Sequence, residues 1–79
     1  MDLGQMLARS AAQNPQKTAL IFHDQPTSYA ELDQRANQVA NALIGLGVQP
    51  GDRVAILIHN IPLYVEAYYG ALKAGATVL

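Results

Sequence analysis

The sequence contains no cysteine among its 79 residues. This absence excludes disulfide bonds, thiolate zinc sites and cysteine nucleophiles. It fits a reducing compartment, and we expect a cytoplasmic protein. A domain of this size buries only about 60% of the surface that its unfolded chain exposes, so its core is marginal when no disulfide, metal or partner supports it.

Charged residues are scarce as well. They account for 14% of the sequence, whereas hydrophobic residues account for 51%, and an average soluble protein has about 25% charged residues. One explanation is that further protein covers much of the surface that these residues form. The net charge is −1 and the five basic residues are scattered, so the sequence lacks the basic patch of a nucleic-acid-binding protein.

Long apolar runs are also missing from the sequence. The longest covers residues 54–58, which is far short of the ~20 residues that a transmembrane helix needs. The first four residues do not lead from a basic stretch into an apolar one, so they do not resemble a secretory signal. We therefore expect no transmembrane segment and no nucleic-acid partner.

The clearest predicted element is a helix over residues 29–46. Ser28 and Glu31 have the spacing of a capping box, in which the serine caps the helix and the glutamate reaches back. Behind them, apolar residues recur at steps of four and three and place one stripe on the helix. These residues are Leu32, Ala36, Val39, Leu43 and Leu46. Gly47 then supplies a left-handed stop.

Two elements are predicted before this helix. Helical spacing of apolar residues predicts a helix over residues 3–13, which ends before Pro15 because the residue that precedes a proline avoids helical geometry. A β-branched and aromatic run predicts a strand over residues 18–23. Residues 27–28 are too short to assign alone, but they could pair back on that strand as a brief hairpin arm.

A second set of elements follows the helix. The near-continuous apolar run predicts a strand over residues 53–58, buried on both faces as in a parallel sheet. A helix over 62–74 with Pro62 in its first turn and a strand over 76–79 complete a βαβ crossover. Small residues in that helix, which would let it approach the sheet closely, are Gly70, Ala71, Ala74 and Gly75. The fold class is therefore α/β, part of a layered domain with a parallel sheet and flanking helices.

The glycine-rich residues 45–51 are a candidate phosphate-binding loop. They do not fit the pattern G-x-G-x-x-G, because Pro50 stands where the last glycine belongs. They also follow a helix, whereas a dinucleotide loop follows a strand and opens a helix. We interpret them as a helix stop and a turn.

His59 and Asn60 form the most interesting polar pair. They follow the predicted strand 53–58, and ligands bind at the carboxyl ends of strands in open α/β sheets. The interpretation that we favour is structural, with Asn60 capping a loop and His59 solvated or packed. His59 and the other histidine, His23, both lack a second ligand at the spacing of a helical metal site.

Each remaining polar candidate has a structural interpretation. Glu31 belongs to the capping box, and Glu66 stands early in a helix, where negative charge suits the dipole. Two aspartates in turns and two serines in helical contexts complete the set: Asp24, Asp52, Ser10 and Ser28. Neither serine follows a sharp strand-to-helix turn, so neither is a credible nucleophile. We therefore predict no catalytic, cofactor-binding or metal-binding residue in this sequence.

Three tyrosines fall on the predicted helix 62–74. Tyr64 and Tyr68 are one turn apart and could line an apolar slot. We favour packing against the sheet or against further protein. The apolar stripe of helix 29–46 could likewise bind a partner helix, although burial within its own domain is the default.

Several segments together carry a family resemblance. They include Pro-Gln-Lys-Thr-Ala-Leu-Ile at residues 15–21, Gly-Asp-Arg-Val at 51–54 and Gly-Ala-Leu-Lys-Ala-Gly at 70–75. In this order and spacing the chain resembles the start of the AMP-binding, adenylate-forming superfamily, which includes acyl-CoA synthetases, adenylation domains of nonribosomal peptide synthetases and firefly-type luciferases. The opening residues 3–7 are more similar to fatty-acyl or aryl-CoA ligases than to peptide-synthetase modules.

Two positions depart from the family pattern. His59 stands where proline is common, and residues 61–63 read Ile-Pro-Leu where many relatives have a small residue, proline and an acidic residue. Both departures change a loop, and the combination of segments remains specific for the superfamily.

The resemblance implies a two-step reaction. A carboxylate and Mg-ATP give an acyl-adenylate, and coenzyme A then displaces AMP to form a thioester. The family's phosphate loop, adenine-binding segment, ATP-contacting aspartate and mobile lysine all lie downstream of residue 79. We therefore expect residues 1–79 to be the N-terminal portion of such a domain, truncated at its C-terminus, inactive by itself and without its own cofactor.

Other interpretations remain open. The expected partners are the remainder of the parent chain and, for the whole enzyme, a small carboxylate and coenzyme A. The chain could instead be a small non-enzymatic interaction module that docks on a ligase. A piece of another Rossmann-like fold is a weaker alternative, because the glycine fingerprint is missing.

Overall fold

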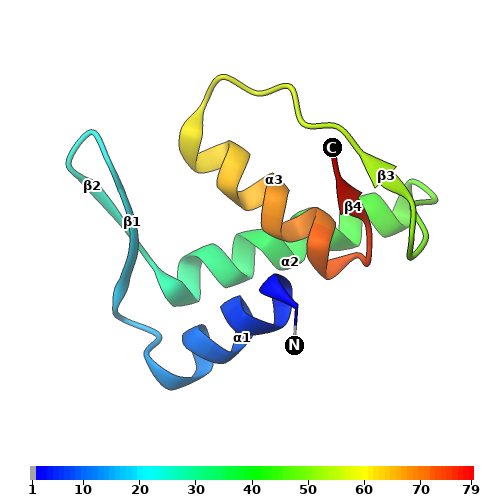
Figure 1. Cartoon of the computed structure of the whole chain (residues 1–79). Helices are drawn as coiled ribbons and strands as arrows, with labels where there is room; N and C mark the ends of the chain where they lie inside the picture. The colour runs from blue at the N-terminus through cyan, green and yellow to red at the C-terminus, as the bar shows by residue number, and fades with distance from the viewer. Residues whose placement is uncertain (1) are drawn as a thin grey trace.

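The computed structural model describes residues 2–79, which form helices and short strands around a small core (Figure 1). The elements in chain order are α1 (Leu3–Gln13), β1 (Thr18–Phe22), β2 (Gln25–Ser28), α2 (Tyr29–Gly45), β3 (Arg53–Val54), α3 (Ile61–Lys73) and β4 (Thr77–Val78). Figure 1 shows α2 crossing the middle of the molecule, with α1 and α3 packed against it. The β1–β2 hairpin lies at one end, and the β3–β4 pair lies at the other. The expected α/β class is confirmed.

Side-chain caps explain where the first two helices begin. Ser28 Oγ accepts a hydrogen bond from the Glu31 backbone N–H at 3.1 Å, and Glu31 Oε1 accepts one from the Ser28 backbone N–H at 3.2 Å. The predicted capping box of α2 is thereby confirmed. The start of α1 carries a second capping box, between Asp2 and Gln5, which we did not predict although its spacing is the same.

Helix α3 begins as the sequence predicted. Asn60 Oδ1 accepts a hydrogen bond from the Leu63 backbone N–H at 3.0 Å, and Pro62 lies in the first turn. The helix ends before Gly75, which has a φ of 85°. A side chain at Gly75 would be strained by that φ and would also contact Pro50.

The core lies between the helices. Its buried centre consists of Leu7 from α1 with Leu32 and Ala36 from α2. Most of the predicted stripe on α2 is buried or half-buried, but Leu46 is 83% exposed. The prediction for Leu46 was wrong because the helix stops at Gly45 and Leu46 occupies the C-cap, where the chain turns away.

Gly70 of α3 lies in close contact with α2. A Cβ built on Gly70 would lie 2.5 Å from Val39 Cβ and 3.0 Å from the Ala36 carbonyl oxygen, both on α2. Ala71 is fully buried nearby. We expected the small residues to serve contact with the sheet, and at Gly70 the close approach is instead between two helices.

The predicted hairpin is present and longer than expected. Strand β2 pairs antiparallel with β1 from Gln25 to Ser28, so Gln25 and Pro26 belong to the hairpin arm as well as residues 27–28. The turn itself consists of His23 and Asp24, which have φ values of 50° and 62°. Positive φ at both central residues is the geometry of a type I′ turn, one of the two common two-residue hairpin turns.

The predicted strand 53–58 is shortened. Strands β3 and β4 pair in parallel, as expected, but each has only two residues. Residues 55–58 are not assigned to a strand, and Leu57 is 93% exposed. The prediction of burial on both faces was therefore wrong for this structure, because neither a longer partner strand nor a covering layer is present among residues 2–79.

Candidate functional site

The glycine-rich residues 45–51 form a helix end and a turn, as interpreted. Gly47 has a φ of 100° and its N–H donates to the Ile44 carbonyl. The Gly51 N–H donates to the Gly75 carbonyl at 2.9 Å, and the Gln49 N–H donates to Asp52 Oδ2 at 2.8 Å. These backbone donors are used within the protein, so they do not form an open cradle for a phosphate.

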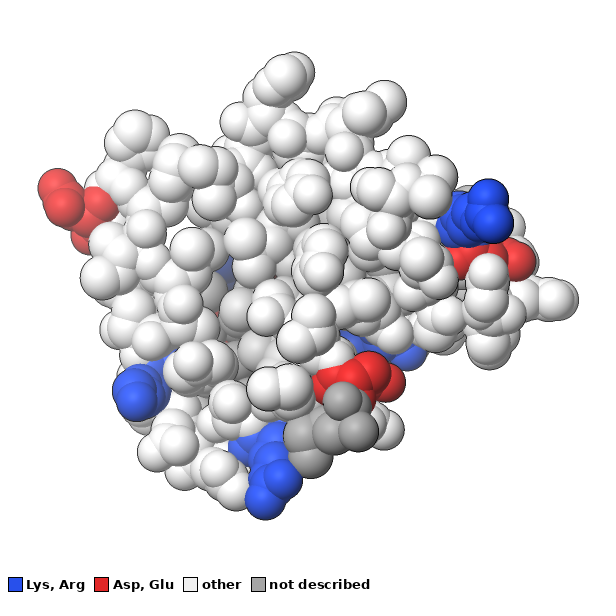
Figure 2. Space-filling view, in the orientation of Figure 1, with Lys and Arg blue, Asp and Glu red and all other residues white. Residues whose placement is uncertain are grey.

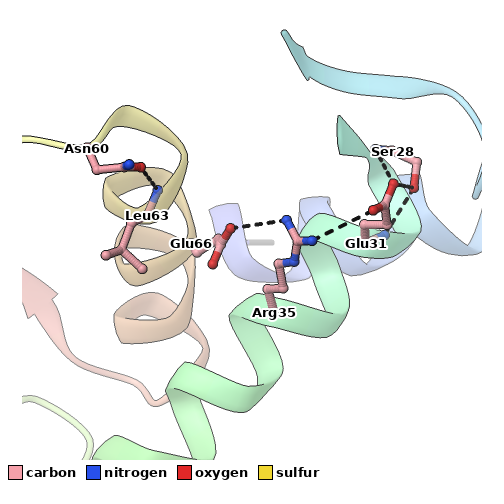
Figure 3. Close-up of polar contacts among 6 residues, drawn as sticks. All are labelled: Ser28, Glu31, Arg35, Asn60, Leu63 and Glu66. Atoms are coloured by element: carbon pink, nitrogen blue, oxygen red, sulfur yellow. Dashed lines mark hydrogen bonds and ion pairs between the residues drawn. The ribbon is translucent and has the colours of Figure 1, made fainter. Parts of the chain in front are cut away.

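His59 and Asn60 have separate environments. Asn60 caps α3 through its side-chain oxygen, as Figure 3 shows. His59 is exposed beside it. The structural interpretation of Asn60 is therefore confirmed, and this cap fixes the entry of the chain into α3.

The remaining candidates for metal or acid–base chemistry do not converge. No group of three or more His, Asp or Glu side chains within residues 2–79 is placed to hold a metal ion. His23 is exposed in the hairpin turn, with its ring 4.1 Å from that of Phe22. Asp24 shares that turn, and Asp52 accepts a hydrogen bond in another, so both aspartates have the structural roles that we predicted.

The tyrosines of α3 pack on one another. The rings of Tyr64 and Tyr68 are stacked with centroids 6.4 Å apart, and Tyr69 meets Tyr68 edge to face at 5.8 Å. Tyr69 also packs against the buried core and lines a pocket of about 270 Å³ between α1, the hairpin and the other helices. All residues that line this pocket are uncharged.

An arginine links two carboxylates across the α2–α3 contact (Figure 3). Arg35 Nη1 lies 3.5 Å from Glu66 Oε2, and Arg35 Nη2 lies 3.8 Å from Glu31 Oε2. The four-residue spacing of Glu31 and Arg35 could have revealed their pairing. The contact between Arg35 and Glu66 joins residues that are 31 positions apart, so no local sequence pattern reveals it.

The pKa of Glu31 is lowered from its ordinary value. The main cause is the hydrogen bond from the Ser28 backbone N–H, followed by that from the Ser28 hydroxyl, with a smaller contribution from the positive charge of Arg35. All of these stabilise the charged carboxylate. A carboxylate held in this state is suited to capping a helix, whereas a general acid needs a raised pKa.

A second ion pair joins α2 to the end of α3. Lys73 Nζ lies 2.7 Å from Asp33 Oδ1, and both side chains are largely shielded from solvent. The Asp33 oxygen is itself buried, so the lysine ammonium balances its charge. This pair was not predicted, because its members are far apart in sequence and only the fold brings them together.

Several of the polar side chains thus serve caps, turns and contacts between helices. None of the helices in residues 2–79 has both the length and the apolar character needed to cross a lipid bilayer. Among the residues that the structure describes, no nucleophile lies beside a base and no pair of carboxylates faces across a cleft. These contacts alone do not identify the protein, whereas the sequence and fold of the whole chain do.

Comparison with known proteins gives that identity. The family model described as AMP-binding enzyme matches residues 7–79. Triostin synthetase I of Streptomyces triostinicus is 39% identical over 94% of this chain, and a feruloyl-CoA synthase of an Amycolatopsis species is 42% identical over 94%. A fatty acyl CoA synthetase structure from Mycobacterium tuberculosis is 36% identical over 95% of this chain, with a TM-score of 0.86.

These relatives are much longer proteins. The chain spans 14% of the triostin synthetase, 15% of the feruloyl-CoA synthase and 15% of the fatty acyl CoA synthetase chain. The family match and the structural likeness both run through nearly all of the chain, from α1 to β4. The chain belongs to the AMP-binding enzyme family of adenylate-forming synthetases.

Proposed function

We propose that these residues are the amino-terminal scaffold of an ATP-dependent acid–thiol ligase. The whole enzyme would join a carboxylate to AMP with release of pyrophosphate, and coenzyme A would then displace AMP to give a thioester. The observation that carries this proposal is the family match over residues 7–79. The similarity to a feruloyl-CoA synthase and to a fatty acyl CoA synthetase supports coenzyme A as the acceptor.

Residues 1–79 themselves contribute structure in this proposal. Polar side chains with a structural contact support this part of the proposal, such as Asn60 at the start of α3 and Lys73 beside Asp33. ATP, magnesium and coenzyme A would be bound by the remainder of the parent chain. In this proposal residues 1–79 are the N-terminal portion of a larger AMP-binding domain, which the remainder of the parent chain completes.

A fatty acid is the substrate that we propose for the whole enzyme. The support is the opening segment, residues 3–7, and the likeness to a fatty acyl CoA synthetase. Aryl acids and amino acids are the competing classes, because relatives of this chain include a feruloyl-CoA synthase and a triostin synthetase. A cytoplasmic location completes the proposal, supported by the absence of cysteine.

The test uses the full-length protein that contains these residues. It is incubated with ATP, magnesium, coenzyme A and either a long-chain fatty acid, an aryl acid or an amino acid, and the products are identified by mass spectrometry. We expect AMP, pyrophosphate and a fatty acyl-CoA thioester. Absence of AMP and pyrophosphate with every acid would refute the ligase proposal, and a thioester formed only from aryl acids would refute the fatty-acid assignment.

The matched control is the 79-residue chain without further protein. Under the same conditions we expect no AMP above the background of a protein-free reaction. Turnover by the 79-residue chain would contradict the scaffold proposal, because it would require catalytic groups among the residues to which we assign structural roles.

A further inference from the structure

Little solvent reaches the ion pair of Asp33 and Lys73. Only 21% of the Asp33 side chain and 13% of the Lys73 side chain are exposed, whereas the Arg35 side chain in the other two ion pairs within residues 2–79 is 47% exposed. On the face of the molecule that Figure 2 shows, charged residues are few, and most of those visible lie toward its margins. The shielding of the Asp33–Lys73 pair therefore needs a structural explanation.

The first helix lies beside both members of this pair. Gly4, which is buried on α1, and Ala8, one turn later, line a small hollow together with Lys73. Ala8 also lines a second hollow, together with Asp33. A helix places residues four apart on the same face. The face of α1 that carries Gly4 and Ala8 is therefore turned toward both charged residues.

The absence of a side chain at Gly4 lets α1 approach Lys73 closely. A Cβ built on Gly4 would lie 3.3 Å from Lys73 Cγ and 3.4 Å from the Lys73 backbone nitrogen. The first distance is shorter than the roughly 3.5–4.0 Å of favourable carbon contacts, so a branched side chain at this position would require α1 to move away. The helix thus packs on the aliphatic stem of the lysine, whose ammonium group reaches Asp33.

The buried oxygen of Asp33 depends on the lysine for the balance of its charge. Asp33 Oδ1 accepts no hydrogen bond from residues 2–79, and Lys73 Nζ lies 2.7 Å from it. Charges that are shielded from water attract each other more strongly than charges at the surface, and salt screens them less. The strength of this ion pair should therefore depend on whether α1 stays in place.

We propose that α1 acts as a lid on the Asp33–Lys73 ion pair, with Gly4 and Ala8 as the surface that closes over it. When the lid is closed, the pair joins α2 to the last turn of α3 and is insensitive to salt. When α1 moves away, water and ions reach the pair, which weakens to the level of a surface ion pair. The position of α1 thereby controls how firmly α3 is held on α2. This device belongs to residues 2–79 and does not depend on the proposed function.

Hydrogen exchange of the Ala74 amide in the full-length protein measures the strength of the ion pair. The Ala74 N–H donates to the Gly70 carbonyl at 3.0 Å, so its exchange requires the last turn of α3 to open. Exchange rates are compared for the wild type, Asp33→Asn, Lys73→Met and the double variant. The factor by which the effects of the two single changes fail to multiply is the coupling between the two residues.

The first measurement leaves α1 unmodified and varies the salt concentration. We expect a coupling of roughly 10-fold that has the same value at low salt and at about 0.5 M salt, because the closed lid keeps ions away from the pair. A coupling that disappears at high salt would overturn the proposal, since the pair would then be open to solvent with α1 in place.

The second measurement displaces the lid with Gly4→Val in the same protein. We expect the coupling to fall to about 3-fold or less, as for an exposed ion pair, and to decrease further as salt is added. The matched control is Gln13→Val, which adds a branched side chain at the exposed last residue of the same helix and should leave the coupling unchanged. An unchanged coupling in Gly4→Val, or an equal loss in Gln13→Val, would show that α1 is not the lid. The salt measurement on unmodified α1 decides the question if Gly4→Val does not fold.

Discussion

Replacing Gly70 with alanine should weaken the contact between α2 and α3. The added Cβ would lie 2.5 Å from both Cβ and Cγ1 of Val39 and 3.0 Å from the Ala36 carbonyl oxygen. Carbon atoms in favourable contact are about 3.5–4.0 Å apart. Val39 is β-branched and cannot rotate freely away, and the carbonyl belongs to the backbone. The two helices must therefore separate by roughly 1 Å.

The expected magnitude is the balance of two opposing terms. Overpacking of this kind costs about 1–3 kcal/mol, and the upper end applies because neither Val39 nor the Ala36 carbonyl can move independently of α2. Alanine is favoured over glycine inside a helix by about 1 kcal/mol. The net loss in the free energy of unfolding is therefore about 2 kcal/mol, which corresponds to a decrease in Tm of roughly 10 °C for a chain of this size.

Gly45→Ala is the matched control for this experiment. Gly45 is the last residue of α2, and no atom lies within 4 Å of a Cβ built there. The same substitution should therefore raise the free energy of unfolding, by up to about 1 kcal/mol. Urea unfolding of the 79-residue chain followed by circular dichroism measures both changes. The close packing of α2 and α3 would be refuted if Gly70→Ala were as stable as the wild type.

Three other perturbations test the polar contacts. Ser28→Ala removes the cap of α2 and should cost about 1 kcal/mol in urea unfolding, so an unchanged midpoint would contradict the capping role. Because the pKa of Glu31 is lowered in the fold from its ordinary value of 4.5, its stabilising effect should be complete above pH 4.5 and should decline as the pH falls below that value. Glu31→Gln should remove this part of the pH dependence, and an identical profile for both proteins would contradict the assignment. Lys73→Met leaves the buried Asp33 oxygen without its cation and should cost about 1–3 kcal/mol, with partial recovery when Asp33→Asn is added; full additivity of the two changes would argue against the ion pair.

Local signals in the sequence were sufficient to predict the helices. Ser28 with Glu31 marked the start of α2, and Pro62 marked the first turn of α3, because such signals depend only on residues within one turn. Their ends were predicted to within one residue. Leu46 was wrongly predicted to continue the apolar face of α2, because the spacing of apolar residues does not reveal where the helix ends.

The strands were harder to predict because their pairing is not local. Residues 53–58 were expected to form a strand buried on both faces, yet only Arg53 and Val54 are paired. An apolar run indicates that a segment favours burial in a sheet. Whether it forms a strand depends on the segments that lie beside it. The same limit applies to the polar contacts, since nothing near Asp33 in the sequence indicates Lys73, which lies beside it only after α2 and α3 have packed.

Part of the sequence pattern that identifies the family has a structural explanation. Gly51 and Gly75 adopt positive φ, and the Gly51 N–H binds the Gly75 carbonyl; these two glycines stand in the segments that carry the family resemblance. Their pattern is explained by the backbone geometry that brings β3 beside β4. The same residues that identify the family therefore build its first parallel strand pair. A sequence pattern can thus reveal the family of a chain from residues that set the course of its backbone.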